Sequence, residues 1–415
     1  MKYVSTRGQA PVLDFEEVLL AGLASDGGLY VPDSWPGLSA AQFRAMRGLP
    51  YAEVAERVIT PFVGDTLSPD LLGRILDAAY ASFDHSCVAP LVQTGPDSWL
   101  MELFHGPTLA FKDVAMQVLG RLYDHVLEKH DKRITIVGAT SGDTGSAAIE
   151  AIRGRERASI FILYPHGRVS EVQRRQMTTV DASNVHNVAI EGTFDDCQDL
   201  LKAMFNDPLF RDEIALSGVN SINWARIVPQ VVYYVTAAVA LGGPDRPVSF
   251  TVPSGNFGDI FAGYVAHRMG LPIERLVVAS NENDILARAL TCGDHRLCEV
   301  TPTLSPSMDI QISSNFERLL YEVHDRDGVR IGELMQAIRD HGGFQIEAPM
   351  LARLQTLFAA HRCDEESTLA TMAAVYDSTG EIIDPHTAVG MYAAGLEARP
   401  GVPMVTLATA HPAKF

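Results

Sequence analysis

The chain has 415 residues, a length that suggests two or three domains rather than one compact core. Its 47% hydrophobic and 20% charged residues are typical of a soluble globular protein. The formal charge of -18 argues against a general binder of nucleic acids or membrane surfaces, because both partners are polyanions.

Two features of the sequence indicate a cytoplasmic protein. No window approaches the run of about 18 apolar residues that crosses a bilayer, and the first residues lack the basic-then-apolar order of a signal peptide. The five cysteines form no pairing framework, which fits a reducing compartment. In CGDHRLC, Cys292, His295 and Cys298 are possible zinc ligands without a clear fourth, so we interpret the segment as a loop and expect no metal site.

Residues 1–90 predict a mainly helical N-terminal domain. Asp14 is a capping-type residue before apolar positions at helical spacing, and SDGGLYVP ends that first helix after Ala24. Three more helical runs, AAQFRAMR, YAEVAERVITPFV and PDLLGRILDAAYASF, follow with Gly- and Pro-containing breaks between them.

From residue 91 to residue 415 the pattern changes to short apolar runs that alternate with helices. Such alternation predicts an α/β fold with a parallel-rich sheet. Strands are expected in LVQT, WLMELF, RITIVGA, SIFILYP, NVHNVAIEG, PVSFTVPS, RLVVASN and PMVTLAT. Late helices are expected around Phe316–Val323, Ile331–His341 and Met350–Arg362.

One lysine, Lys112, lies in the apolar segment ELFHGPTLAFKD. A lysine with such neighbours is commonly a surface residue whose stem covers an apolar patch. A partly desolvated lysine also has a lowered pKa and can form a Schiff base with a carbonyl. The second interpretation requires a phosphate-binding loop elsewhere in the chain.

The segment Ser254–Asp259, SGNFGD, is a candidate for that loop. It joins the predicted strand that ends at Pro253 to the helix IFAGYVAHRM, so its backbone amides and the helix N-terminus suit a phosphate. A plain helix-capping turn explains a single loop of this kind equally well. The sequence contains neither GxxxxGK[ST] nor GxGxxG, so ATP and NAD lose their usual support.

A second strand-to-helix junction, Thr140–Gly145, repeats this arrangement. Its hydroxyls and amides suit a carboxylate or another phosphate, but Asp143 would repel an anion unless a cation faces it. Other polar clusters follow predicted strands or begin helices, and taken singly each is explained by a solvated helix start. They include Arg168, Asn223 and Arg226, the segment DPHTA from Asp384, and Thr409 in the C-terminal ATAHPAKF.

Taken together, these motifs resemble the threonine synthase family of fold type II pyridoxal-phosphate enzymes. The resemblance covers nearly the whole chain and departs from the family only slightly, for example at Thr193. The motifs, in order, are STRG, SDGGLYVP, ELFHGPTLAFKD, GATSGDTGSAA, TFDDCQ, NSINWARI, VPSGNFGDI, LSPSMDIQISSNFERL, DPHTAVG and ATAHPAKF. The resemblance implies a tryptophan synthase β-like catalytic region at residues 91–415. Within this region a small subdomain lies roughly at 113–240, and the remaining residues form a large subdomain.

The resemblance also implies roles for individual residues. Lys112 would carry pyridoxal 5'-phosphate as a Schiff base and act as the catalytic base. The cofactor would also contact Gly255, Asn256, Phe257, Asp259 and, at the ring nitrogen, Thr409. The substrate would contact Ser141, Asp143, Thr144, Arg168, Asn223 and Arg226.

The implied reaction converts O-phospho-L-homoserine and water into L-threonine and phosphate, the last step of threonine biosynthesis. Two alternatives stay open: a pyridoxal-phosphate-dependent phospho-lyase or dehydratase that releases 2-ketobutyrate, and a non-catalytic protein that binds a phosphate ligand. Closure of the domain that carries the Thr140–Gly145 loop is expected to keep water out until late in the reaction. The sequence does not distinguish a monomer from a homodimer.

Overall fold

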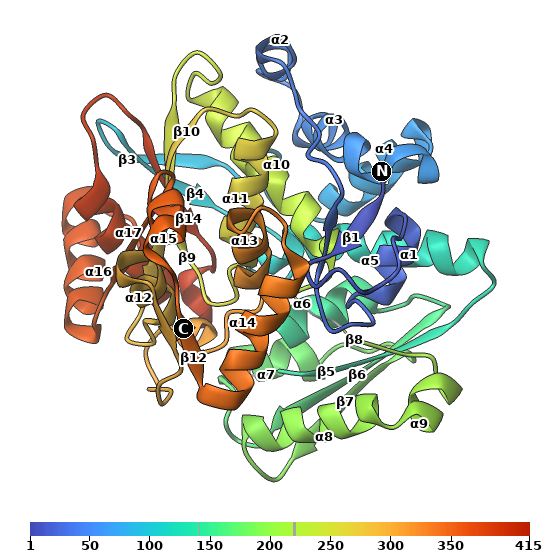
Figure 1. Cartoon of the computed structure of the whole chain (residues 1–415). Coiled ribbons are helices and arrows are strands. Elements are labelled where there is room, and N and C mark those ends of the chain that lie inside the picture. Colours follow the sequence, from blue (N-terminus) through green and yellow to red (C-terminus); the bar gives the residue numbers. More distant parts are fainter. Residues whose placement is uncertain (141, 219–220) are drawn as a thin grey trace.

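Two β-sheets organise the chain (Figure 1). The computed structural model describes residues 1–140, 142–218 and 221–415. The larger sheet has the order β13-β10-β9-β14-β4-β3 and the smaller one β7-β6-β5-β8. Their strands are β3 (Leu91–Gly95), β4 (Ser98–Glu102), β5 (Ile134–Ala139), β6 (Ala158–Pro165), β7 (Val185–Ile190), β8 (Leu216–Gly218), β9 (Val248–Pro253), β10 (Ile273–Ser280), β13 (Phe358–Arg362) and β14 (Met404–Ala408).

Both sheets are mostly parallel, as the sequence predicts. All three pairings in the smaller sheet are parallel, and in the larger sheet β3 and β4 form the antiparallel pair at one edge. All six residues of the central strand β9 are buried, which is why its sequence is almost continuously apolar. The α/β class is therefore confirmed.

Helices cover both sheets, and Figure 1 shows α8 and α9 outside the smaller sheet and α16 and α17 beside the larger one. The helices after residue 90 are α5 (Lys112–Lys129), α6 (Asp143–Ile152), α7 (Glu171–Thr178), α8 (Phe194–Asn206), α9 (Pro208–Glu213), α10 (Trp224–Ala240), α11 (Gly258–Arg268), α12 (Ile285–Cys292), α13 (Phe316–Val323), α14 (Gly328–His341), α15 (Ala348–Gln355), α16 (Glu365–Thr379) and α17 (Pro385–Glu397). Short elements complete the region: β11 (Asp294–Arg296), β12 (Gly343–Gln345) and the 3₁₀ turns η2 (Pro306–Met308) and η3 (Pro412–Lys414).

The N-terminal region contains four α-helices among its described residues and packs on the rest of the chain. Asp14 caps the first helix in a reciprocal capping box with Glu17. Trp224 at the start of α10 is fully buried against rings from the N-terminal region, so one hydrophobic core joins the two parts. The elements are β1 (Tyr3–Ser5), α1 (Phe15–Ala21), β2 (Tyr30–Pro32), α2 (Ala40–Arg44), α3 (Tyr51–Val63), η1 (Gly64–Thr66) and α4 (Pro69–Tyr80).

One predicted helix, Met350–Arg362, is only half correct. The helix ends at Gln355, and residues Phe358–Arg362 form β13, which pairs in parallel with β10. A short apolar run has no periodicity that separates a strand from a helix, and here the open edge of β10 decides the outcome. The expected loop around His295 likewise contains a short strand, β11, and His295 is buried between the rings of Phe316 and Phe344.

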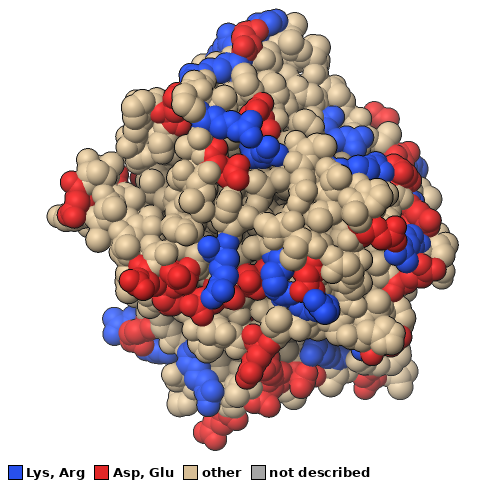
Figure 2. All heavy atoms as spheres, turned by 60° about the vertical axis from the view of Figure 1, so that its left-hand side comes forward, with Lys and Arg blue, Asp and Glu red and all other residues tan. Residues whose placement is uncertain are grey.

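The chain has more acidic than basic residues, but they do not form one continuous acidic patch on the face shown in Figure 2. On that face acidic and basic side chains are interspersed. Among the helices that the structure describes, none has the length and apolar character to span a bilayer. The loops that follow β5, β9 and β14 lie at the carboxyl ends of these strands, the usual position of a binding site in an α/β protein.

Candidate functional site

Lys112 is the first residue of α5 and lies beside the end of β14. The backbone N–H of Phe111 donates to the carbonyl of Thr409 over 2.8 Å. The next residue, Asp113, is fully buried and accepts hydrogen bonds from the backbone N–H and the hydroxyl of Thr108, both at 2.7 Å. These contacts close the turn before the helix and hold Lys112 next to Thr409.

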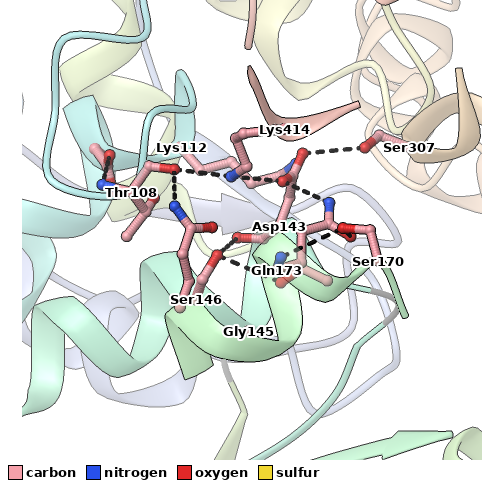
Figure 3. A network of polar contacts seen from close by, with 12 residues as sticks. Thr108, Lys112, Asp143, Gly145, Ser146, Ser170, Gln173, Ser307 and Lys414 are labelled. Atoms are coloured by element: carbon pink, nitrogen blue, oxygen red, sulfur yellow. Dashed lines mark hydrogen bonds and ion pairs between the residues drawn. The ribbon is translucent and has the colours of Figure 1, made fainter. Parts of the chain in front are cut away.

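Asp143, the first residue of α6, faces two lysine amines (Figure 3). The Nζ of Lys414 lies 2.7 Å from Oδ1, and the Nζ of Lys112 lies 3.4 Å from Oδ2. The cations that the sequence alone could not supply are therefore present, and Asp143 does not oppose the binding of an anion nearby. Lys414 comes from the last turn of the chain, η3, and was not predicted as a site residue.

Two more side chains hold the Asp143 carboxylate. Gln173 in α7 donates to Oδ1 over 3.0 Å, and the hydroxyl of Ser307 in η2 donates to Oδ2 over 3.2 Å. Gly142 makes room for this arrangement, because a Cβ there would lie 2.2 Å from the side-chain oxygen of Gln173 and the backbone has φ +149°. The carboxylate is thus fixed by partners from four elements.

The electrostatics of the site follow from these contacts. Burial lowers the pKa of Lys112; Asp143 opposes this effect, and the cations Lys414 and Arg226 add to it. Burial works against the Asp143 carboxylate, but Lys112 and Lys414 outweigh it and hold its pKa far below the usual range. Lys112 therefore gives up its proton more readily than an ordinary lysine, while Asp143 stays ionised.

The loop after β9 presents backbone donors. The carbonyl of Gly255 accepts from the hydroxyl of Ser313 at 2.7 Å, and that of Asn256 accepts from the backbone of Asn315 at 3.1 Å. The backbone N–H groups of Gly255, Asn256 and Phe257 donate to no acceptor among the residues that the structure describes. Phe257 adopts φ +62°, which turns the chain into α11, and free amides at a helix N-terminus suit a phosphate.

Two details of this loop bear on what it binds. A Cβ on Gly255 would lie 3.0 Å from the carbonyl oxygen of Ser307, so a larger residue there would require the Ser307 segment to shift by a few tenths of an ångström. Asp259 is buried and accepts hydrogen bonds from Ser254 and from the backbone N–H of Ile260. Burial raises the pKa of Asp259 to about 6, so its charge is readily neutralised beside an anion.

Arg226, in the first turn of α10, is a buried cation with two nitrogen groups that have no partner among the described residues. Its Nε and Nη1 groups have no hydrogen-bond acceptor within the described part of the chain, and the residue is 4% exposed. Burial lowers the pKa of its guanidinium to about 10. A buried guanidinium with free N–H groups is a strong site for a carboxylate or a phosphate.

The structure does not join every predicted site residue to this cluster. The Asn223 carboxamide caps α10, accepting from Ala225 N–H at 3.0 Å and donating to the carbonyl of Leu19 at 2.9 Å, so it is already engaged. Arg168 is exposed in the turn after β6, and Thr144 is half-buried in the first turn of α6. Ser141 lies outside the described residues.

Several residues that the sequence interpretation left without a role do reach the site. His386 accepts a hydrogen bond from the backbone N–H of Ser307 at Nε2, 3.2 Å away, and its Nδ1 lies 2.6 Å from Asp384. Asp384 also caps α17, which agrees with the helix start that the sequence indicated. Ser307, Lys414 and Gln173 belong to motifs of ordinary appearance, and only their long-range contacts mark them.

The residues present fit a cofactor that carries an aldehyde and a phosphate. Lys112 supplies a partly desolvated amine, the Ser254–Asp259 loop supplies free amides, and Thr409 is buried next to Lys112 at the end of β14. Thr409 is 6% exposed, and a hydroxyl in that position suits an unprotonated ring nitrogen.

Comparisons with known proteins bear on this site. Residues 2–80 match the family model described as threonine synthase N terminus, residues 89–340 match pyridoxal-phosphate dependent enzyme, and residues 387–415 match threonine synthase, C-terminal. The chain is 55% identical over 416 aligned residues to a threonine synthase from Pseudomonas aeruginosa, covering 100% of the chain and 89% of the relative. The corresponding identity to a threonine synthase from Saccharomyces cerevisiae is 43%, covering 100% and 87%.

Solved structures give the same result. The crystal structure of pyridoxal-phosphate-bound threonine synthase from Brucella melitensis matches with a TM-score of 0.98 and 59% identity, covering 100% of this chain and 89% of that one. A maize serine racemase, 13% identical with a TM-score of 0.54 over 87% of this chain and 92% of its own, shares the fold alone.

Proposed function

The chain belongs to the threonine synthase family of pyridoxal-phosphate-dependent enzymes, and from that premise we propose that it converts O-phospho-L-homoserine and water into L-threonine and phosphate. The observation that carries the proposal is the proximity of three groups: the amine of Lys112, the amide loop at Ser254–Asp259 and the guanidinium of Arg226, two of whose nitrogen groups have no partner among the described residues. Lys112 interacts electrostatically with both Arg226 and Asp259, so the three groups lie in one region. An amine for a carbonyl and two anion sites match a phosphate-bearing cofactor and a phosphate-bearing substrate.

In this proposal Lys112 binds the cofactor covalently through its amine, Gly255, Asn256 and Phe257 hold its phosphate, and Thr409 contacts its ring nitrogen. Asp259 lies beside the phosphate loop and stabilises it through Ser254. When bound, the cofactor supplies an electron sink that stabilises negative charge on the substrate carbon that bears the amino group.

Lys112 also performs the proton transfers. Once the substrate amine displaces it, its own amine is the nearest base for the α-proton and then for the β-proton. Its lowered pKa makes the neutral form more accessible than that of an ordinary lysine. The Cγ–O bond then breaks and phosphate leaves with the bonding electron pair, and the hydroxyl of water bonds to Cβ. Of the three protons released from Cα, Cβ and water, one returns to Cα, one goes to Cγ and one to the departing phosphate, which balances the overall reaction.

Arg226 is the candidate for the substrate phosphate. Negative charge accumulates on that group as the Cγ–O bond breaks, and a cation already desolvated and unpartnered stabilises it without reorganisation. Substrate contacts by Asp143, Ser141 and Thr144 remain part of the proposal, since the Asp143 carboxylate lies 3.4 Å from the Nζ of Lys112. Arg168 and Asn223 have weaker support, because Arg168 is exposed and Asn223 is engaged in a helix cap.

We further propose the domain division at residue 90, the subdomain roughly at 113–240 and a cytoplasmic location. The small sheet lies wholly within 113–240, which supports the subdomain. The five cysteines are free, which fits a reducing compartment.

Turnover of O-phospho-L-homoserine tests the function. Purified protein reconstituted with pyridoxal phosphate should release equal amounts of threonine and phosphate. Release of 2-ketobutyrate and ammonia instead would support the phospho-lyase alternative. Phosphate binding without turnover, by a protein that carries no borohydride-fixed cofactor on Lys112, would support a non-catalytic role.

A further inference from the structure

Lys414, the second-last residue, is a buried lysine that the reaction outlined above does not use. The side chain is fully buried, and its Nζ donates to Asp143 over 2.7 Å and to the carbonyl of Thr108 over 2.8 Å (Figure 3). An ammonium group loses much of its hydration when it is buried, so these two contacts must offset a large cost. Because burial of the Lys414 ammonium costs free energy, we ask what role this group has in the candidate active site.

The end of the chain is built to deliver this lysine. The backbone N–H of His411 donates to the carbonyl of Leu109, and the His411 side chain accepts from the N–H of Ala413, which starts the η3 turn. The ring of Phe415 packs on His386 with centroids 4.6 Å apart. Lys414 is therefore anchored on both sides and does not reach the site by chance.

Asp143 presents a difficulty for the chemistry of Lys112. A carboxylate 3.4 Å from an amine favours the protonated form of that amine, and an ammonium group cannot remove a proton. Lys414 sits closer to the same carboxylate and is more deeply buried than Lys112, whose side chain is 13% exposed. The charges of Asp143 and Lys414 nearly cancel at the position of Lys112. The pairing therefore removes most of the attraction between the Asp143 carboxylate and a protonated Lys112 amine.

We propose that Lys414 is a positioning residue for the reaction: it pairs with Asp143 so that this carboxylate orients Lys112 without holding it as an ammonium ion. The inference deepens the proposed function and rests on it. Lys414 acts through Asp143 and does not itself exchange protons with the substrate. Its removal leaves Lys112 facing an uncompensated carboxylate.

The other charged groups near Lys112 and Asp143 are the same in wild type and in all variants. Arg226 on α10 adds positive charge, Asp259 on α11 lies in range, and His386 on α17 acts on Asp143. Asp113 on α5 acts on Lys414. None of these groups is altered in the variants below, so the comparison isolates the pair Asp143–Lys414.

The test measures the basicity of Lys112 directly in protein stripped of cofactor. Only a neutral amine attacks an aldehyde, so the rate at which pyridoxal phosphate attaches to Lys112, followed by absorbance across a pH series, reports the fraction of neutral amine. Borohydride fixation and peptide mass mapping verify that Lys112 is the residue modified. Lys202→Met, which removes an exposed lysine on α8, is the matched control and should keep the wild-type midpoint.

Lys414→Met should raise the pH midpoint for attachment by about one unit or more, because two charges at this separation couple strongly at a buried site. Lys414→Arg keeps the charge and should stay within about 0.3 unit of wild type. Asp143→Asn should lower the midpoint, since the attraction on Lys112 is lost. The double variant Asp143→Asn with Lys414→Met removes both charges and should return the midpoint to within about 0.5 unit of wild type.

A midpoint for Lys414→Met that stays at the wild-type value, or falls, overturns the proposal. Should Lys414→Met fail to fold, the charge-balanced double variant and Asp143→Asn decide the matter by the same criterion: an unchanged or raised midpoint in Asp143→Asn contradicts the argument. The attachment assay needs no O-phospho-L-homoserine. Failure of wild-type protein to form threonine would therefore reject the proposed function, whereas an unshifted midpoint would reject the role of Lys414.

Discussion

Replacement of Arg226 by methionine should make the ligand-free protein more stable and at the same time abolish its capacity to bind substrate phosphate. Arg226 is 4% exposed and two of its nitrogen groups have no partner among the described residues. The guanidinium is thus a charge buried in advance of its ligand. Methionine keeps the apolar stem and removes the charge, so folding no longer has to desolvate a cation.

The magnitude follows from the pKa of Arg226. Burial lowers that pKa from 12.5 to about 10, and each unit corresponds to about 1.4 kcal/mol. The folded state therefore disfavours the cation by about 3 kcal/mol, and because neutral pH lies below both values, the whole penalty is present there. Because the shorter methionine side chain also packs less well in the space of the guanidinium, we expect the free energy of unfolding to rise by about 1–3 kcal/mol.

The assay is urea unfolding of cofactor-free protein in a buffer without phosphate or sulfate, at neutral pH. Arg318→Met is the matched control, because Arg318 is also a fully buried arginine but its guanidinium donates to Asn315 and to the carbonyls of Tyr30 and Ile222. Burial also lowers the pKa of Arg318, to about 9, so its removal relieves the burial of a cation by about 5 kcal/mol. It also leaves three buried acceptors unpaired at about 1–3 kcal/mol each, so the net effect should be a destabilisation of about 1–2 kcal/mol.

Opposite signs for the two variants are the expected signature. A destabilised Arg226→Met protein, comparable with Arg318→Met, would show that the Arg226 guanidinium is paired in solution and would refute its assignment as a preformed anion site. Millimolar phosphate should stabilise wild type and leave Arg226→Met unaffected, so the difference in unfolding free energy between these two proteins should become smaller.

Three further variants test other parts of the structure. Lys112→Ala should abolish threonine formation and covalent cofactor retention while circular dichroism stays unchanged; residual turnover near wild type would contradict its role as base. Burial raises the pKa of Asp113 to about 6, so protonation of this carboxyl adds about 2 kcal/mol to the unfolding free energy between pH 6 and pH 4. Buried His295, whose pKa is lowered to about 4, acts in the opposite direction, so the measurement is the difference between wild type and Asp113→Asn in cofactor-free protein, which should change by about 2 kcal/mol over that range. Gly120→Ala should destabilise the protein by about 1–3 kcal/mol in urea, because the new Cβ would lie 2.3 Å from the carbonyl oxygen of Ala151, and an unchanged midpoint would show that α5 and α6 separate freely.

The fold class and several candidate site segments could be predicted from the sequence, because they depend on local chemistry. The alternation of strands and helices predicts the α/β class because side-chain burial imposes a period on each element. Lys112 and the loop Ser254–Asp259 are recognisable because their chemistry depends on a short stretch of backbone: a lysine opening a helix, and glycines that leave amides free at a helix N-terminus. Arg226 became a candidate only through the resemblance of its motif to the family, because a polar residue at a helix start has an ordinary explanation when taken alone.

Contacts between distant segments were decided only by the tertiary structure. Residues Phe358–Arg362 become a strand because β10 offers an open edge, which no local period records. Asp143 was ambiguous until Lys414, from the opposite end of the chain, was found on its carboxylate, and Ser307 acquired its role by lying between Asp143 and Gly255. A charge acquires its pKa from whatever surrounds it, and those surroundings exist only once the chain has folded.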